Sequence, residues 1–435
     1  MTRELRDSGV GWLGDTPAAW SVVPARALFG ERKQKSSATD VHLTPSQKYG
    51  VLPQAEYMEI TGNKVVLNLS GADNMRHVEA GDYVSHLRSF QGGLEFAGIP
   101  GKVSAAYTVL KPKVALEPRF FKYLFKSDLY VQALQTTTDQ LRDGQSIRYG
   151  QFTLIPLPYP ELDEQRAIAD YLDRETAQID AFIAKNEELI TLLTERRAAV
   201  TAQAVTRGID DSGELKESGL GWLGSIPEDW EAVRVKFAVR SLPGFAFASG
   251  DFVDDTGATR LLRGINVGVG SISWAETVGI ENPPADVERR YMLDEGDLVL
   301  GMDRPVISGG LRVARVGPGD AGSLLVQRVL RLRGTRVRND YLEYSLAWGG
   351  FAMYIEPDFT GVSVPHMSEQ QVGNFAIALP DLSTQERIVD YLRDQHSAID
   401  TALDAARRSI DLMRERRAAL ISAAVTGKID VGVVA

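Results

Sequence analysis

The chain repeats itself at a scale that sets its architecture. The heptapeptide Ser8–Gly14 returns with one change, valine to leucine, as Ser218–Gly224, an offset of 210 residues. AspTyrLeu at Asp170–Leu172 returns unchanged at Asp390–Leu392, an offset of 220. A tandem duplication on this scale predicts two equivalent globular domains, each followed by the same kind of helix, and pseudo-two-fold symmetry in the folded chain.

The length and the repeat divide the chain into four parts. Domains usually contain about 100–200 residues, so 435 residues exceed one core. Each globular part shows short apolar runs between turn residues, which indicates mixed short strands and turns. We therefore expect an α+β protein with two tandem α/β domains and two long helices. The boundaries that we expect are 1–160 (first domain), 161–210 (first helix), 211–380 (second domain) and 381–430 (second helix).

The two long segments carry the clearest periodicity. Asp163–Val205 and Ser383–Val425 contain no glycine or proline, and Ser383 with Glu386 has the spacing of an N-terminal capping box. Apolar residues recur at intervals of three and four, as along a coiled-coil seam. About 40 residues at ~1.5 Å each make a rod of roughly 60 Å. We expect the two helices to pair antiparallel, although each could instead pack on its own domain. The seam residues are Ile168, Leu172, Ile179, Ile183, Ile190, Leu193, Val200, Ile388, Leu392, Ile399, Leu403, Ile410, Met413 and Leu420.

Motifs for catalysis or metal binding are missing from the sequence. It has no cysteine, its five histidines show no paired ligand spacing, and it lacks the GxxxxGK[ST] phosphate loop. We therefore expect neither an enzyme nor a metal site. No apolar run reaches the 18 residues of a membrane span, and no apolar signal core opens the chain. A cytoplasmic protein without a membrane is the expectation.

Acidic and basic residues are unevenly distributed along the chain. A net charge of −10 argues against a nucleic-acid partner. However, Lys102–Lys126 contains six basic residues and one acidic residue, and Gly301–Asp340 contains eight arginines and three aspartates. Because the two basic windows lie in corresponding parts of the two halves, the global charge does not exclude binding to phosphates.

Several motifs, in their order along the chain, resemble the specificity subunits of Type I restriction–modification systems, over essentially the whole length. Met302–Gly310 departs from the first domain's LeuArgSerPheGlnGlyGly, as two domains with different target sequences would. The motifs of the resemblance are the openings Trp12–Trp20 and Trp222–Trp230, the domain segments Gly81–Gly93 and Ser104–Pro112, and the helix starts Asp163–Leu172 and Thr384–Leu392.

The resemblance implies a DNA-reading subunit without catalytic activity. Each recognition domain would read one half of a bipartite target in double-stranded DNA, with the helices as a spacer. Two methyltransferase subunits would dock on the chain, and a motor–nuclease subunit can join them. S-adenosylmethionine, ATP and Mg would belong to those partners, and this chain would hold no cofactor. Half-sites about one turn, or ~34 Å, apart could then be read from one face of the duplex.

Side-chain chemistry selects the candidate DNA contacts. Forked or bidentate groups suit base edges, and simple cations suit phosphates. We predict base contacts from Arg88, Gln91, Arg304 and Arg312, and phosphate contacts from Lys102, Lys111, Arg142, Arg148, Arg328 and Arg331.

Two other functions stay open at this point. The helices could serve a protein–protein scaffold that never reads DNA, in which case DNA binding would be absent or insensitive to salt. Alternatively, the chain could be a fused DNA methyltransferase or nuclease, which would require S-adenosylmethionine binding or activity from this polypeptide alone.

Overall fold

The duplication appears in the structure as two compact units. The computed structural model describes residues 3–63, 75–86, 89–137, 147–210, 213–254, 257–359 and 365–432. Unit 1 comprises Met1–Glu187 with Arg407–Ala435, and unit 2 comprises Glu188–Ala406. Each unit therefore holds one globular body, the first half of one long helix and the second half of the other. The four-part division expected from the sequence treated each helix as a separate segment, whereas contacts divide each helix between the units.

Unit 1 is built on a four-stranded sheet in the order β4-β11-β8-β9. Phe29, on the edge strand β4, is fully buried and makes edge-to-face contacts with Tyr83, Phe121 and Phe152. The strands are β1 (Leu5–Asp7), β2 (Asp15–Pro17), β3 (Ser21–Pro24), β4 (Phe29–Glu31), β5 (Leu43–Ser46), β6 (Gly50–Pro53), β7 (Arg76–Val78), β8 (Tyr83–Val84), β9 (Glu95–Phe96), β10 (Gly101–Val103), β11 (Val109–Pro112) and β12 (Pro156–Tyr159). The helices are α1 (Ala25–Leu28), α2 (Gln54–Thr61), α3 (Ser89–Gly92), α4 (Pro118–Lys126), α5 (Asp128–Gln135) and α6 (Tyr149–Phe152), with the start of α7 (Leu162–Arg207).

Unit 2 repeats this sheet as β16-β25-β20-β23 and adds a second sheet, β17-β19-β18-β24. Its strands are β13 (Leu215–Glu217), β14 (Ser225–Pro227), β15 (Glu231–Arg234), β16 (Val239–Pro243), β17 (Phe252–Val253), β18 (Thr259–Leu262), β19 (Gly279–Ile280), β20 (Leu298–Gly301), β21 (Val306–Ile307), β22 (Gly310–Leu311), β23 (Val313–Arg315), β24 (Leu324–Leu325), β25 (Val329–Gly334) and β26 (Ala376–Leu379). The helices are α8 (Ala285–Tyr291), α9 (Asn339–Ala347), α10 (Gly350–Phe359), α11 (Glu369–Asn374) and the start of α12 (Leu382–Val425), with short 3-10 turns η2 (Val235–Phe237), η3 (Ser249–Asp251) and η4 (Gly264–Asn266).

The strand pairs at the edges of the two bodies correspond one to one. The hairpin β1–β2 matches β13–β14, and the pair β3–β12 matches β15–β26. The first three strands are offset by 210 residues and the last by 220, so the change of offset arises inside the body. The duplication predicted from the sequence is confirmed, and the second sheet of unit 2 shows where the bodies diverge.

The repeated GlyAsp pair has one structural role in both bodies. Gly81 and Gly296 have φ angles of 97° and 86°, a left-handed conformation that glycine adopts without strain. The following aspartates are buried and form ion pairs with arginines: Asp82 with Arg32 and Asp297 with Arg333. The motif therefore positions a buried carboxylate at the start of β8 and of β20.

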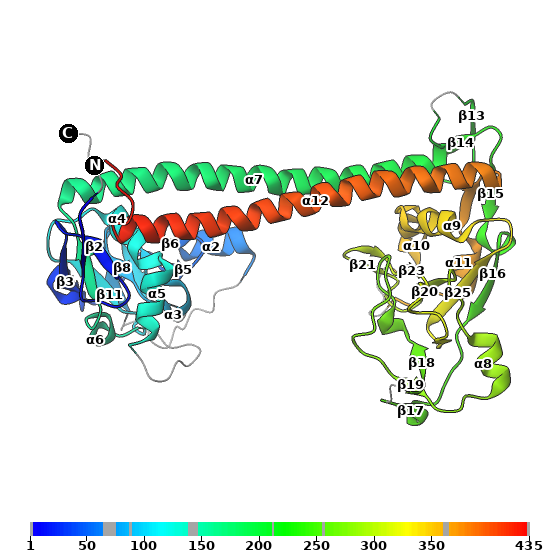
Figure 1. The fold of residues 1–435 in the computed structure, drawn as a ribbon, viewed down its shortest axis with the longest axis horizontal. Coiled ribbons are helices and arrows are strands. Elements are labelled where there is room, and N and C mark those ends of the chain that lie inside the picture. The colour runs from blue at the N-terminus through cyan, green and yellow to red at the C-terminus, as the bar shows by residue number, and fades with distance from the viewer. Residues whose placement is uncertain are drawn as a thin grey trace. The chain divides into compact units, whose positions relative to one another are not determined.

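The helices α7 and α12 pack against each other and run antiparallel (Figure 1). In unit 2, Arg197 pairs with Asp400, and Thr201 lies 2.8 Å from His396. In unit 1, Asp180 of α7 lies 3.3 Å from Arg417 of α12. Partner numbers fall on α12 as they rise on α7, which is the mark of an antiparallel pair. The predicted coiled coil is confirmed, and all fourteen predicted seam residues are buried or half-buried.

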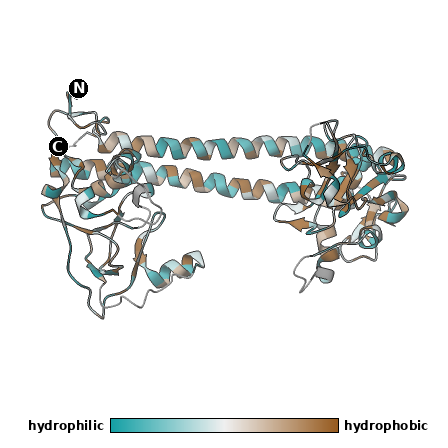
Figure 2. Ribbon diagram, turned by 90° about the horizontal axis from the view of Figure 1, so that it is seen from below, coloured by the Kyte–Doolittle hydropathy of each residue, from teal (hydrophilic) through white to brown (hydrophobic). Residues whose placement is uncertain are grey.

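Each helix also ends inside the core of a body that it does not follow in sequence. Ile421, Ala424 and Val425 at the end of α12 pack with Trp20 in the core of unit 1. Ala204 and Val205 at the end of α7 pack with Trp230 in unit 2. The alternative in which each helix packs only on its own domain is therefore wrong. Figure 2 shows hydrophobic residues recurring along both helices, as this double packing requires.

The helix starts differ in one detail from the expected caps. Asp381, and not Ser383, caps α12, because its carboxylate accepts hydrogen bonds from the backbone N–H groups of Ser383 and Thr384 at 2.8 and 3.1 Å. These hydrogen bonds, together with those from the two hydroxyl groups, hold the pKa of Asp381 well below its ordinary value. The prediction failed because serine and aspartate are both good caps and the helix begins one residue earlier.

A buried glutamine in each shared helix-start motif ties the helix to its body. The side-chain amide of Gln165 donates to the carbonyl of Pro160, and its oxygen accepts from the backbone N–H of Glu117. The amide of Gln385 donates to Pro380 and accepts from the N–H of Arg338 in the same way. Because both side chains are fully buried, these bonds satisfy polar atoms that water cannot reach.

His396 makes the helix pair of unit 2 sensitive to pH. Burial, and secondarily the nearby Arg197, lowers the pKa of His396 below its ordinary value of 6.5, with Asp400 opposing the shift. Tyr344 also contacts the ring, edge to face at 5.3 Å. A histidine whose pKa is lower in the folded state binds protons more weakly there, so its protonation favours unfolding.

We expect His396 to lower the free energy of unfolding as the pH is lowered from 7.5 to 5, whereas His77 in unit 1, whose pKa is raised, against the opposing effect of burial, by its carboxylate partners, acts in the opposite direction. His396→Asn should remove the contribution of His396, which urea titrations followed by circular dichroism at several pH values would measure. Equal slopes for the wild type and the variant would contradict this assignment.

Candidate nucleic-acid interface

Half of the predicted DNA contacts lie exposed on the two bodies. Gln91 in α3, Lys111 on β11 and Arg148 before α6 are exposed in unit 1. Arg304 and Arg328 are exposed in unit 2. Arg88 and Arg142 lie outside the described residues. Exposed cations and amides of this kind can reach a polyanion without breaking contacts inside the protein.

Lys102 and Arg331 require a correction, because both are at least half-buried and donate to backbone carbonyls. Lys102 is buried, and its ammonium group donates to the carbonyls of Ser37 and Ala38 at 3.4 and 3.2 Å. Arg331 is half-buried, donates to the carbonyl of Met292 at 3.1 Å, and has its pKa lowered by burial. We reassign these two residues from phosphate contacts to the support of loops.

The guanidinium of Arg312 is also used inside the protein, so the predicted base contact of Arg312 is corrected as well. Its guanidinium donates from Nε to the carbonyl of Val267 at 2.9 Å and from Nη1 to that of Asp303 at 2.7 Å. A third bond runs from Nη2 to the carbonyl of Gly264. Burial lowers the pKa of Arg312. Three carbonyls from two loops occupy the fork that base recognition would need, so Arg312 fixes these loops to each other.

The loops that Arg312 fixes border a groove of about 730 Å³ in unit 2. Its base is apolar, with buried Phe247, Val267 and Val326. Its rim carries Arg263, Asp303 and Arg328 together with exposed Ile307. An apolar base with a few polar groups on the rim is the usual composition of a recognition site.

His366 contacts two residues of this rim, Asp303 and Arg328, and the sequence did not predict it. Its Nδ1 lies 2.7 Å from a carboxylate oxygen of Asp303, and its two ring nitrogens lie 3.2 and 3.1 Å from Nη1 of Arg328. An isolated bridge of backbone pairing joins Asp303 to His366. Since the two residues are 63 positions apart, no sequence spacing would have brought them together.

Unit 1 places a related but differently built cluster after the corresponding strand. Following β8, His86 lies 3.4 Å from Glu95, which also pairs with Lys126 at 2.6 Å. All three groups are more enclosed than their counterparts in unit 2, where Arg328 is 55% exposed. The frame is thus shared while the polar groups on it differ.

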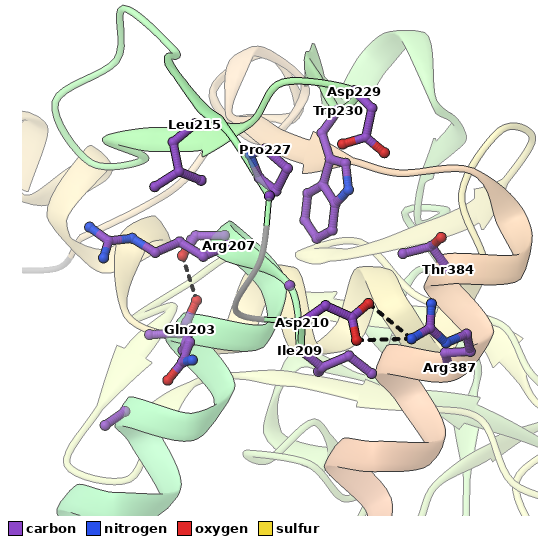
Figure 3. Close-up of a pocket in the computed structure, with 15 residues that line it drawn as sticks. Gln203, Arg207, Ile209, Asp210, Leu215, Pro227, Asp229, Trp230, Thr384 and Arg387 are labelled. Atoms are coloured by element: carbon purple, nitrogen blue, oxygen red, sulfur yellow. Dashed lines mark hydrogen bonds and ion pairs between the residues drawn. The ribbon is translucent and has the colours of Figure 1, made fainter.

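A cavity of about 870 Å³ lies elsewhere, where α7 ends in unit 2 (Figure 3). Arg387 from α12 donates to both carboxylate oxygens of Asp210 at its edge, at 3.1 and 2.9 Å, and Trp230 forms one wall. This cavity contains none of the predicted DNA contacts.

The matching place in unit 1 is filled by a side chain. Arg3 lies over the ring of Trp20, 5.3 Å from its centroid, and donates to Glu164. The residue at the equivalent position in unit 2, 210 residues later, is Gly213. Part of this cavity is therefore the space beside Trp230 that no arginine side chain fills.

Among the residues of the described ranges, no group of three or more histidine, aspartate or glutamate side chains is arranged to hold a metal ion. Within the same ranges, no helix combines the length and the apolar character that a membrane crossing requires.

Two unlike globular bodies on a shared antiparallel helix pair define the class as a tandem α/β-domain protein with a coiled-coil connector. The chain is 28% identical over 285 residues to the MjaVIII specificity subunit of a Type I restriction enzyme from Methanocaldococcus jannaschii, covering 64% of this chain and 63% of the relative. It is 29% identical over 282 residues to the EcoAI specificity subunit from Escherichia coli, covering 60% and 46%. The matches thus span less than two thirds of these relatives, and no family model matches the chain.

Solved structures show the same fold. A chain from a structure of the assembly and conformational transition of the type I R-M system superposes with a TM-score of 0.72 at 14% identity, covering 95% of this chain and 99% of that one. The HsdS subunit of Thermoanaerobacter tengcongensis gives 0.59 at 16% identity, covering 95% and 98%. The resemblance to Type I specificity subunits is confirmed by the sequence matches, and the fold by the structures.

Proposed function

We propose that this chain is the DNA-specificity subunit of a Type I restriction–modification complex and catalyses no reaction itself. The observation that carries the proposal is a frame built twice with different polar groups on it. Corresponding strands and helix starts recur in both units, while the clusters after β8 and β20 differ in residues and exposure. A protein that reads one sequence in two different halves needs this combination.

The proposal assigns each body one half of a bipartite target in double-stranded DNA. Arg304 and Arg328 in unit 2, and Gln91, Lys111 and Arg148 in unit 1, are the exposed contacts that the structure leaves available. The paired helices would set the number of unspecified base pairs between the halves. Two methyltransferase subunits would dock on the chain, and a motor–nuclease subunit can join. S-adenosylmethionine, ATP and Mg would be bound by these partners.

The test is the methylation pattern that the chain directs. The chain is co-expressed with its methyltransferase subunit in a host that lacks other methylation, and the host DNA is sequenced by a method that detects modified adenine. We expect one split motif, with two short specified halves separated by unspecified bases. A continuous motif, or methylation that is unchanged when this chain is omitted, would contradict the proposal.

The dependence of binding on salt separates this proposal from a scaffold that never reads DNA. Neutralising several phosphates releases counterions, so the affinity of the assembled complex for target duplex should fall steeply as salt rises from 50 to 200 mM, by about 10³-fold for six contacts. Binding that does not change with salt would favour the scaffold. S-adenosylmethionine binding by the isolated chain would instead favour a fused enzyme.

A further inference from the structure

Two arginines of unit 2 adopt a backbone conformation that normally favours glycine: Arg328, which lines the groove, and Arg304, which follows the lining residue Asp303. The φ angles of Arg304 and Arg328 are 43° and 74°. Across the part of the chain that the structure describes, Asn282 is the only other residue besides glycines with positive φ. A side chain with a Cβ atom is strained in this conformation, and such strain concentrates at functional sites. Arginine at both positions indicates that the side chains are needed where they stand.

The two strained residues belong to one hydrogen-bonded frame. The N–H of Arg304 donates to the carbonyl of Pro365 at 2.8 Å, and the N–H of Met302 donates to the carbonyl of Arg328 at 2.9 Å. Met367 in turn donates to Met302 at 2.8 Å. Arg312 holds the same loop from below through the carbonyl of Asp303. The backbone around both arginines is therefore fixed before any ligand arrives, as a specific reader requires.

Neighbouring side chains orient the guanidinium of Arg328 without using all of its hydrogen-bond donors. Its Nη1 lies beside the His366 ring, which Asp303 holds at 2.7 Å, while the distance from Nη1 to the Asp303 carboxylate is 4.0 Å. More than half of the Arg328 side chain is exposed. The Asp303 carboxylate lies closer to His366 than to Arg328. Part of the Arg328 guanidinium therefore remains directed to solvent at the rim of the groove.

Geometry of this kind suits a base edge better than a phosphate. An arginine fork can also bind a phosphate, but a flexible lysine supplies that charge equally and needs no strained backbone. A rigid fork matches the O6 and N7 atoms of guanine in the major groove, and exposed apolar groups such as Ile307 and Ile265 match the methyl group of thymine.

We propose that Arg328, held by the Asp303–His366 pair, reads a guanine in the half-site assigned to unit 2. The inference rests on the proposed DNA-reading function and changes the role predicted for Arg328 from a phosphate contact to a base contact.

The test uses Arg328→Gly and Arg328→Lys in the full chain, co-expressed with the methyltransferase subunit. Glycine relaxes the positive φ, so the melting temperature should stay equal or rise. Methylation should nevertheless fall about tenfold or more at the wild-type sites and lose discrimination at one G·C pair of one half-site. Lysine keeps the charge without the fork and should lose the same discrimination. Arg336→Lys, at an exposed arginine paired with Glu231, is the control and should leave the motif unchanged.

Three results would overturn the inference. An unchanged motif with lower stability would make Arg328 structural. A uniform fall of methylation at all sites, with every position still discriminated, would make it a phosphate contact. If the wild-type complex directs no split motif, the proposed function itself fails and the inference fails with it. Arg328→Asn, which also tolerates this backbone conformation, repeats the readout if the glycine variant is unstable.

Discussion

Replacing Asp82 with alanine is expected to lower the free energy of unfolding by about 3 kcal/mol. The Asp82 carboxylate is 1% exposed and accepts two hydrogen bonds from Arg32, at 2.5 and 3.0 Å, and one from the backbone N–H of Glu79 at 2.8 Å. The bond to Asp82 raises the pKa of Arg32 above its ordinary value. Without the carboxylate, a mostly buried guanidinium and an N–H group lose their partner together.

The matched control is Asp170→Ala, which removes an exposed partner of Arg119 at 2.7 Å. Exposed ion pairs contribute about 0–1 kcal/mol, so this variant should unfold almost like the wild type. Urea titrations followed by circular dichroism measure both. If Asp82→Ala costs no more than Asp170→Ala, the GlyAsp motif does not have the structural role that we assign to it.

Trp20→Ala should be comparably severe, at about 3–5 kcal/mol. The indole is 1% exposed and contacts Phe120 edge to face at 6.3 Å. It also packs beside Gly427, just after the end of α12. A Cβ atom at Gly427 would lie 3.0 Å from the Trp20 ring, so the packing there is tight. Loss of the ring would leave a hole between the body and the helix end.

The equivalent Trp230→Ala should cost less, because the cavity where α7 ends in unit 2 already borders one side of that ring. The difference between the two variants reports the combined contribution of Phe120 and of Arg3, which covers Trp20 but has Gly213 as its counterpart. Equal losses of unfolding free energy would mean that the helix end, and not the arginine, provides the packing in both units.

The long helices could be predicted because their signal is local. Residues at intervals of three and four fall on one face of a helix whatever the rest of the chain does, and Ile168, Leu172 and Ile179 accordingly lie buried. Where the helices end could not be predicted. Whether Val425 enters the core of unit 1 depends on contacts with residues 400 positions earlier, which no local pattern encodes.

The sequence shows which residues of the candidate site are basic, but not which of them are exposed. A basic residue is visible in the sequence, but its burial is not, so Lys102 and Arg312 were assigned to DNA although their donors serve backbone carbonyls. His366 was missed because its partner Asp303 is distant in sequence. The backbone strain at Arg304 and Arg328 is a property of their φ angles, which the sequence does not show.

The central claim is that the repeated frame presents two different readers. It is tested most directly by replacing residues 215–379, from β13 to β26, with a second copy of residues 5–159, from β1 to β12, because the strands at these limits correspond. Since α7 and α12 run antiparallel, we expect two identical bodies to read inverted copies of one sequence.

The measurement is the methylation motif that this hybrid directs when it is co-expressed with the methyltransferase subunit, beside the motif of the wild type. The account predicts that the hybrid keeps one wild-type half-site and replaces the other with its inverted repeat. A folded hybrid that methylates the unchanged wild-type motif, or a continuous one, would contradict the account.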